Sequence, residues 1–501
     1  MGEAQTYTIP VPTRGINLVD PIDMMEPWYA LELNNLVPAG ISLYLRGGYT
    51  SYSTTGASTG ATLALRAINN ADGTSDLISQ ANGFLWDTGT PVAVALNAVA
   101  YSDTPFNSDT FAHRGYFANG VDNLQVVNAG AVADSTFTGI ALDSLINVST
   151  YKERLYFIEK TSLKVWYGNT QAVGASALTS FDFQFAMKDG GYLVMCGSWT
   201  NNTADTSRDL FFALSSEGEI LFYQGSSPAD TTTPWGLVAR YKIGKPLGYR
   251  ACVEVENDRW ILTNQGLVSI ASLFSSSILE AFKGIGDKIN PYLSQQAALF
   301  SFSSLWGGTF WSKGRRVYIT VPTSGANTKT LIYHMDGGWA PYTFGANEDA
   351  LVTETMGQNI YYGSPMATVF LGENGTTDNG AAISYDARFA FNFFGTRGNF
   401  KTFKDCRPLM RTSPSTSLQI GIDTDFKRSA ELATISPGSS TYTAWGSLWG
   451  SAWSTGTSYL YNRYNLPGTG HSGALRIKGS VLSSTLEFYA FEVGFETGSR
   501  V

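Results

Sequence analysis

The chain has 501 residues, of which 43% are hydrophobic and only 15% are charged, and its net charge is −8. A protein that binds nucleic acid tightly is expected to be basic, so this charge disfavours such binding. Three cysteines, Cys196, Cys252 and Cys406, lie far apart without a CxxC pair. That spacing disfavours a disulfide framework or a zinc site and fits folding in a reducing cytoplasm.

The remaining composition predicts an all-β protein. The chain contains 26 Tyr, 29 Phe, 12 Trp and 52 Gly. Aromatic side chains suit the pleated surface of a strand, and glycine suits the tight turns between strands. We find no signal peptide and no apolar run of about 18 residues, so we expect no stable membrane insertion.

The first 50 residues predict an extended arm that leads into a first strand. Prolines occur at positions 10, 12, 21, 27 and 38. Proline lacks the backbone N–H that a central strand donates, so it disfavours the interior of a sheet. An arm of this kind can reach a neighbouring subunit, where contact area offsets the entropy lost on ordering.

Residues 51–375 predict a β-propeller. Seven times an apolar strand, a short turn and a second apolar strand follow one another, at intervals of roughly 40 to 55 residues, close to the ~40–50 of propeller repeats. Seven hairpins indicate six to eight blades, and unrelated hairpins in sandwiches are the alternative. The hairpins span residues 77–86, 115–127, 154–167, 209–223, 258–270, 316–335 and 358–371.

One stretch between the hairpins has helical spacing. Apolar residues at 278, 279, 282, 285 and 289 recur every three or four positions, with Ser277 available as N-cap and Pro291 beyond the end. This predicts a helix near 277–290. It would either contact a neighbouring subunit or cap the core of the propeller.

Residues 376–501 predict a C-terminal β-sandwich or barrel, because polar and apolar residues largely alternate in 382–391, 417–423 and 485–496. Within it Trp445, Trp449 and Trp453 recur at every fourth position. Their rings would either pack on the face of a sheet or form an exposed strip that binds sugars.

The sequence offers little that predicts catalysis, so we expect no enzyme, no cofactor and no metal site. Its three histidines show no metal-binding spacing, and neither a nucleophile elbow nor a phosphate-binding loop is present. Glu254 and Glu256 could in principle form a carboxylate pair, but acids on one strand more often serve solvation. Asp378-Asn-Gly is a weak candidate for a calcium loop.

Three stretches resemble the tail nozzle proteins, also called tail hub proteins, of short-tailed bacteriophages. The first runs from Gly15-Ile-Asn through Pro27-Trp-Tyr-Ala to an R-x-G-Y turn at 46–49. The second covers 216–228, 235–248 and 257–267, and the third covers 473–479 and 486–498. Together they span nearly the whole chain.

The resemblance implies a virion protein at the distal end of the tail, made in the host cytoplasm. It implies six copies of a propeller-based subunit in a ring around a channel, attached to the tail adaptor protein and able to carry fibres or spikes. Genomic DNA would pass through without specific binding. The family has no active site to transfer, so Gly218, Gly225, Arg46 and Arg476 are interpreted as residues of turns and of strand or interface pairing.

Two other functions remain open from the sequence alone. One is a host-receptor or glycan-binding propeller module on the tail, for which Trp445, Trp449 and Trp453 would be the sugar platform. The other is a glycan-degrading propeller enzyme.

Overall fold

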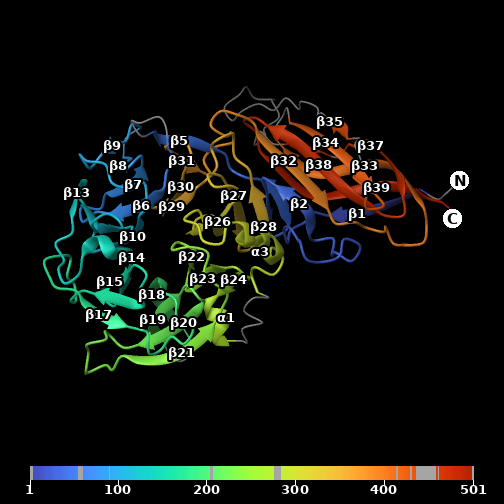
Figure 1. Cartoon of the computed structure of the whole chain (residues 1–501). Coiled ribbons are helices and arrows are strands. Elements are labelled where there is room, and N and C mark those ends of the chain that lie inside the picture. The colour runs from blue at the N-terminus through green and yellow to red at the C-terminus, as the bar shows by residue number, and fades with distance from the viewer. Residues whose placement is uncertain are drawn as a thin grey trace. The chain divides into compact units, whose positions relative to one another are not determined.

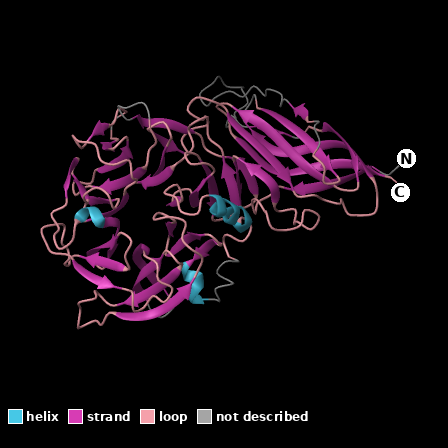
Figure 2. Cartoon of the chain, in the orientation of Figure 1, coloured by secondary structure: helices cyan, strands magenta, loops and turns pink. Residues whose placement is uncertain are grey.

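The structure, a computed structural model, is built of antiparallel β-sheets with little helix (Figures 1 and 2). It describes residues 4–54, 60–89, 91–202, 207–275, 284–412, 416–428, 432–435, 458–460 and 462–498. Helices in the described part are α1 (Ile270–Ser275), α3 (Asn290–Leu299) and the 3-10 turn η1 (Leu142–Ser144). None of the described helices is both long and apolar enough to cross a membrane.

The chain divides into two compact units. One, here the seven-sheet unit, contains residues 51–330 and 344–371. The other, the two-sheet unit, contains residues 1–50, 331–343 and 372–501. The two-sheet unit therefore combines three separated segments, and its residues 331–343 include the last strand of one of the seven small sheets that give the other unit its name.

Seven small sheets, most of four strands, follow one another along the chain. Within each sheet the strands are hydrogen-bonded in sequence order, except that β5 is added beside β31 as the last strand of the last sheet. The sheets are β6–β9 (Ala64–Asn69, Ser75–Ala81, Phe84–Asp87, Val94–Ala95), β10–β13 (Asn107–Phe111, Arg114–Ala118, Gln125–Asn128, Ala131–Asp134), β14–β17 (Leu145–Tyr151, Arg154–Glu159, Lys164–Tyr167, Thr179–Asp182), β18–β21 (Leu193–Asn202, Ser207–Ser215, Glu219–Gln224, Gly236–Lys242), β22–β24 (Cys252–Val255, Asp258–Thr263, Gly266–Ser269), β25–β28 (Gly307–Trp311, Arg316–Pro322, Thr328–His334, Trp339–Tyr342), and β29–β31 (Val352–Met356, Asn359–Gly363, Thr368–Gly372) with β5 (Tyr49–Thr54).

All seven hairpins expected from the sequence are present, and each forms the second and third strands of one sheet. The turns use the residues that the pattern indicated. Between β7 and β8, Asn82 and Gly83 have φ values of 53° and 75°, the left-handed conformation that a two-residue hairpin turn requires. Gly218, between β19 and β20, has φ 84°, and Gly225, after β20, has φ 123°.

The middle strands are buried on both faces because each sheet packs between two others. In β15, Tyr156 and Ile158 pack in one cluster with Phe211 of β19. Their neighbours Leu155 and Phe157 point to the opposite face and join a cluster with Tyr116 of β11. Burying each such large side chain contributes roughly 1.5–3 kcal/mol. This double-sided burial produces the nearly continuous apolar runs of the hairpins.

The last sheet packs against the first. Leu65 and Leu77 of the first sheet form a cluster with Tyr361 and Val369 of the last. The first strands of neighbouring sheets also contact one another. β6 contacts β10, β10 contacts β14 and β14 contacts β18; β22 contacts β25, β25 contacts β29, and β29 contacts β6. β18 contacts the next sheet through β23. Figure 1 shows the sheets following one another around a ring, with β5 beside β31.

The two-sheet unit consists of two sheets whose aromatic side chains meet. Tyr385 packs on Phe488, and Phe389 packs edge-on against Phe491. One sheet has the order β2 (Ala30–Asn34), β32 (Ile383–Phe389), β38 (Gly473–Val481), β34 (Ser417–Thr424), β35 (Ala433–Ile435). The other has the order β3 (Leu36–Ala39), β4 (Ser42–Leu45), β39 (Leu486–Thr497), β33 (Lys401–Thr412), β36 (Ser458–Leu460), with β1 (Ala4–Pro10) on β39 and β37 (Tyr464–Gly470) on β33.

The first 50 residues differ from the arm that the prolines predicted. They contribute β1 to β4 to the two-sheet unit, where β1 pairs antiparallel with β39 and β2 with β32. The prolines fit because they avoid central positions. Pro10 is the last residue of β1, and Pro38 lies in the edge strand β3, where a missing N–H costs little.

The expected helix near 277–290 is only partly described. Residues 276–283 lie outside the described part, and 284–289 form bends and turns. Pro291, which was expected to follow a helix, instead occupies the first turn of α3. Proline suits that turn because the first helical N–H groups have no partner within the helix.

Arg46 is buried in the two-sheet unit and links segments that are far apart in the sequence. Its guanidinium donates to both carboxylate oxygens of Asp378 at 2.7 Å, to the side-chain oxygen of Asn35 at 2.9 Å and to the carbonyl oxygen of Thr343 at 2.9 Å. The Arg46 and Asp378 side chains are 1% and 8% exposed. Asp378, the weak calcium-loop candidate, therefore serves as the counter-ion of a buried arginine.

Arg476, the other arginine singled out in the sequence, pairs across two neighbouring strands. From β38 it donates to Asp386 of β32 at 2.9 Å and 3.3 Å. Both arginines that were interpreted as pairing residues thus have carboxylate partners within their own unit.

Removing Arg46 should destabilise the protein strongly. We expect Arg46→Ala to lower the free energy of unfolding by about 3–5 kcal/mol, because it leaves the Asp378 carboxylate buried without a counter-ion. Arg14→Ala is the matched control: Arg14 and Glu26 form an ion pair at 2.7 Å but are 55% and 57% exposed, so its loss should cost less than about 1 kcal/mol. Urea denaturation measures the free energy of unfolding of both variants. An equal loss in the two variants would contradict the role of Arg46 as the counter-ion of a buried carboxylate.

Candidate functional site

A polar cavity of about 610 Å³ lies where the first strands of the seven sheets meet. We call it the central cavity. Every sheet of the seven-sheet unit contributes at least one residue to its wall, among them Leu65, Asp109, Ser149, Gly197, Glu254, Thr309 and Thr353. Because part of each first strand faces this cavity, first strands carry polar residues such as Asn107, Asp109 and Glu254 that the middle strands largely lack.

Arg66 connects three sheets across the wall of the cavity. From β6 its guanidinium lies 2.5 Å from Asp109 of β10 and 3.8 Å from Glu354 of β29. Burial raises the pKa of Glu354, and the nearby Arg66 opposes that rise. The three groups thus join the first, second and last sheets by charge as well as by apolar packing.

Glu254 and Glu256, the carboxylates considered for catalysis, both line the cavity but in different settings. Glu254 accepts from Arg259 at 3.0 Å and its side chain is 66% exposed. Glu256 lies in the turn between β22 and β23, with φ 53°. Glu254 is therefore half of an ion pair that faces solvent.

Arg250 lines the cavity and donates to backbone carbonyl oxygens. Its guanidinium donates to the carbonyl oxygens of Leu63 and Ser304, each at 2.8 Å. Burial lowers the pKa of Arg250 to about 10, so the side chain stays charged at neutral pH. It ties the start of the first sheet to the loop before β25.

Two of the three cysteines, Cys196 and Cys252, also line the cavity. Burial raises the pKa of the Cys196 thiol to about 12, although its contact with the Ser149 hydroxyl at 3.1 Å acts in the opposite direction. Burial likewise raises the pKa of Cys252. Both thiols are therefore protonated at neutral pH and are poor nucleophiles.

The cavity can hold water or a small polar molecule between groups of both signs. Among the described residues, no three His, Cys, Asp or Glu side chains gather as metal ligands would. Trp445, Trp449 and Trp453, the strip predicted from the sequence, lie outside the described residues. Of the cavity residues, the sequence had drawn attention to Glu254, Glu256, Cys196 and Cys252, but not to a cavity that they share. The signal available for the others was the polar stretch Asn107-Ser-Asp-Thr before an apolar hairpin.

No protein-family model matches the chain, and no curated protein matches it. Among solved structures, two of the extracellular domain of one regulatory system of B. thetaiotaomicron, described once as a hybrid two-component and once as a one-component system, share 11% identity with it. Their TM-scores are 0.42 and 0.44, with 76% and 79% of this chain and 44% and 49% of those chains covered.

A third similar structure is PorZ, a surface component of the type-IX secretion system of Porphyromonas gingivalis. It shares 11% identity at a TM-score of 0.31, with 68% of this chain and 45% of that chain covered. This chain thus spans less than half the length of these three structures. Because all three TM-scores are below 0.5, we transfer no property from them.

Glu354 should make stability depend on pH in a defined direction. A carboxyl group whose pKa is raised by folding binds its proton more tightly in the folded state than in the unfolded state. The free energy of unfolding therefore falls as the pH rises above the pKa of the unfolded state, which is near 4.5 for Glu354. We expect the native protein to lose stability relative to Glu354→Gln between pH 4 and pH 7. Urea denaturation of both proteins across this range tests it; a constant difference would contradict the effect.

Proposed function

We propose that this chain is a structural protein of a short-tailed bacteriophage virion and forms the nozzle at the distal end of the tail. Several copies, six by the resemblance described above, form a ring attached to the tail adaptor protein. The genome leaves through the opening between the copies, and fibres or spikes can attach to the ring.

We further propose that the seven sheets are the seven blades of a β-propeller. The packing of Leu65 and Leu77 on Tyr361 and Val369 supports this, because it brings the last sheet onto the first. The strand order β29-β30-β31-β5 supports it as well. In it the last blade takes its outer strand from residues 49–54, so the chain itself holds the ring of blades closed.

The observation that carries the nozzle proposal is how the first and third resembling stretches combine. The R-x-G-Y turn at 46–49 contains the buried Arg46. The strand just before it, β4, pairs with β39, which contains most of the third stretch. Residues of the stretches that resemble tail nozzle proteins therefore lie together in the two-sheet unit, which supports a role for them in architecture.

The central cavity does not serve as the genome channel in this proposal. A DNA duplex is about 20 Å wide, so even a 10 Å length of it fills roughly 3,000 Å³. The cavity measures about 610 Å³, and the ion pairs of Arg66 lie in its wall. A channel for DNA must therefore lie between copies of the chain, which is why the proposal requires a ring.

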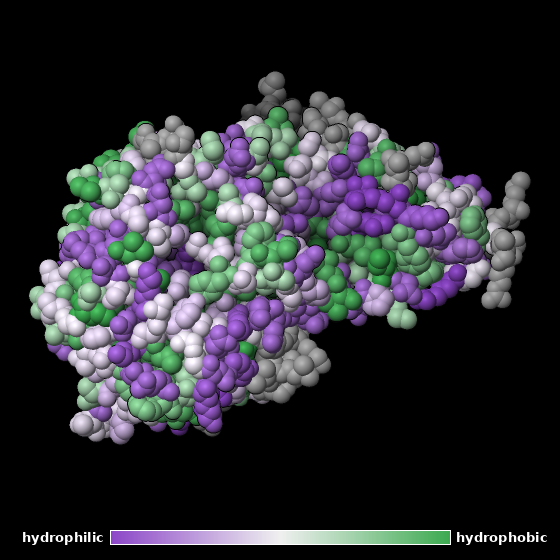
Figure 3. Space-filling model, viewed as in Figure 1, coloured by the Kyte–Doolittle hydropathy of each residue, from purple (hydrophilic) through white to green (hydrophobic). Residues whose placement is uncertain are grey.

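Charge supports a channel wall that does not retain DNA. The net charge of −8 is small for a chain of 501 residues. Figure 3 shows hydrophilic and hydrophobic residues side by side over much of this face, with a denser group of hydrophilic residues over strands of the two-sheet unit. Tight binding would need clustered lysine and arginine that release counter-ions from phosphates.

Cryo-electron microscopy of the purified protein and of phage tails tests the proposal. We expect a ring of copies around an opening wider than the ~20 Å of a duplex, at the distal end of the tail. A compact single copy attached to the side of the tail would contradict the nozzle and favour a receptor-binding module.

The tryptophans distinguish the nozzle from a glycan-binding module. We expect Trp449→Ala/Trp453→Ala to leave both virion assembly and adsorption to host cells unchanged, because a nozzle needs no sugar platform. Adsorption assays on assembled virions measure this. Normal virions that no longer adsorb would favour the glycan-binding alternative.

A further inference from the structure

The loop between β1 and β2, residues 17–29, exposes an unusual number of large apolar side chains. Met24 is 69% exposed. Four others in the same loop are 42–46% exposed: Leu18, Val19, Ile22 and Trp28. Isolated exposed apolar residues are common, but a contiguous group of this kind marks an interaction surface.

The loop is held in place by its own contacts. The side-chain oxygen of Asn17 accepts hydrogen bonds from the N–H groups of Val19 and Asp20 at 3.1 Å. Arg397 donates to the carbonyl oxygen of Asp23, and the side chain of Met25 is buried. A partner would therefore meet a pre-formed surface and would not have to order it.

The charges of the loop indicate a basic partner. Residues 17–29 contain Asp20, Asp23 and Glu26 and no lysine or arginine. Glu26 pairs with Arg14 outside the loop, in an exposed pair. A surface that combines apolar side chains with positive charge would complement this loop.

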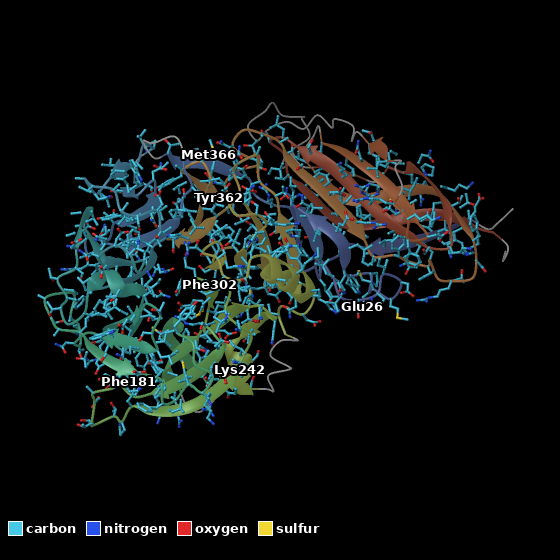
Figure 4. The ribbon with its side chains drawn as sticks, viewed as in Figure 1. Glu26, Phe181, Lys242, Phe302, Tyr362 and Met366 are labelled. Atoms are coloured by element: carbon cyan, nitrogen blue, oxygen red, sulfur yellow. The ribbon has the colours of Figure 1, made fainter. Side chains whose placement is uncertain are left out.

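One outer strand of the seven-sheet unit has those properties. Of the described last strands of the seven sheets, β9, β13, β17, β21, β24, β28 and β5, β21 alone contains basic residues, Arg240 and Lys242, and it contains no carboxylate. A bulge opposite Phe222 and Tyr223 interrupts its pairing, and Leu237 and Val238 are 47% and 44% exposed there. Figure 4 labels Glu26 on the loop and Lys242 on β21.

Lys242 of β21 can exchange its partner at little cost. It pairs with Asp189, and both side chains are about half exposed; exposed ion pairs of this kind contribute roughly 0–1 kcal/mol. Re-pairing of Lys242 with Asp20 or Asp23 of a second copy would therefore lose little. Arg240 lies 3.7 Å from Glu219, whose side chain is only 5% exposed, so Arg240 keeps that partner and adds positive charge to the strand.

We propose that loop 17–29 of one copy docks on strand β21 of a second copy. The two surfaces differ, so the contact is head-to-tail and repeats around a ring until it closes. The inference rests on the proposed ring, and it names the residues that join neighbouring copies.

Site-specific crosslinking tests the contact. A photo-crosslinking amino acid at position 24, in a mixture of isotope-labelled and unlabelled full-length chains, should give adducts between copies that map to residues 236–242. The same amino acid at position 41, where Ile41 is 84% exposed outside the loop, should give none there. Adducts from position 24 to other surfaces would overturn the proposal.

Variants test the head-to-tail geometry. Ile22→Gln/Met24→Gln and Leu237→Glu should each weaken assembly at least about tenfold by sedimentation velocity, a loss of about 1.4 kcal/mol per tenfold. Ile41→Gln should assemble normally. A mixture of the first two variants keeps one intact loop and one intact strand per pair, so it should form dimers and no larger rings.

The outcomes separate this contact from the nozzle function. Rings that form normally with either variant would overturn the contact and leave the nozzle intact. A native chain that does not self-associate at any concentration would also overturn it. Imaging of the tail would then decide the nozzle function independently.

Discussion

The packing of the last of the seven sheets on the first is the contact on which this structure depends. Each sheet of the seven-sheet unit has two apolar faces and needs a neighbour on both, so a linear row of sheets would leave its two outermost faces in water. Packing of Leu65 and Leu77 on Tyr361 and Val369 removes that exposure, and Arg66 adds charge pairing at the same junction. Strand β5 completes the last sheet.

The sequence predicted the middle strands well because their environment is simple. Strands buried on both faces need uninterrupted apolar residues, as in Leu155 to Ile158, and that pattern is visible in the sequence. The first strands carry polar residues such as Asn107 and Asp109 because they line the cavity, and outer strands such as β9 are short and exposed. Neither the first strands nor the outer strands show the alternation of apolar and polar residues by which half-buried strands are recognised in a sequence.

The N-terminal segment and the cavity could not be predicted from local patterns. Prolines indicated an arm because the sequence does not show that Pro38 would lie in an edge strand. Arg66, Asp109 and Glu354 come from the first, second and last of the seven sheets, and only the packing of the last sheet on the first brings them together. Arg46 was noticed through the resemblance, but its partner Asp378 was considered only as a weak candidate for a calcium loop.

The pairing of β1 with β39 has a consequence for biosynthesis. Residues 4–10 leave the ribosome long before their partners at 490–496 do. At 5–20 residues per second the interval is roughly 25–100 s. During that time β1 has no β39 to pair with, whereas the sheets between β6 and β21 already have their strands. The two-sheet unit therefore completes only once residues 490–496 have emerged, and nascent chains need protection from edge-to-edge aggregation until then.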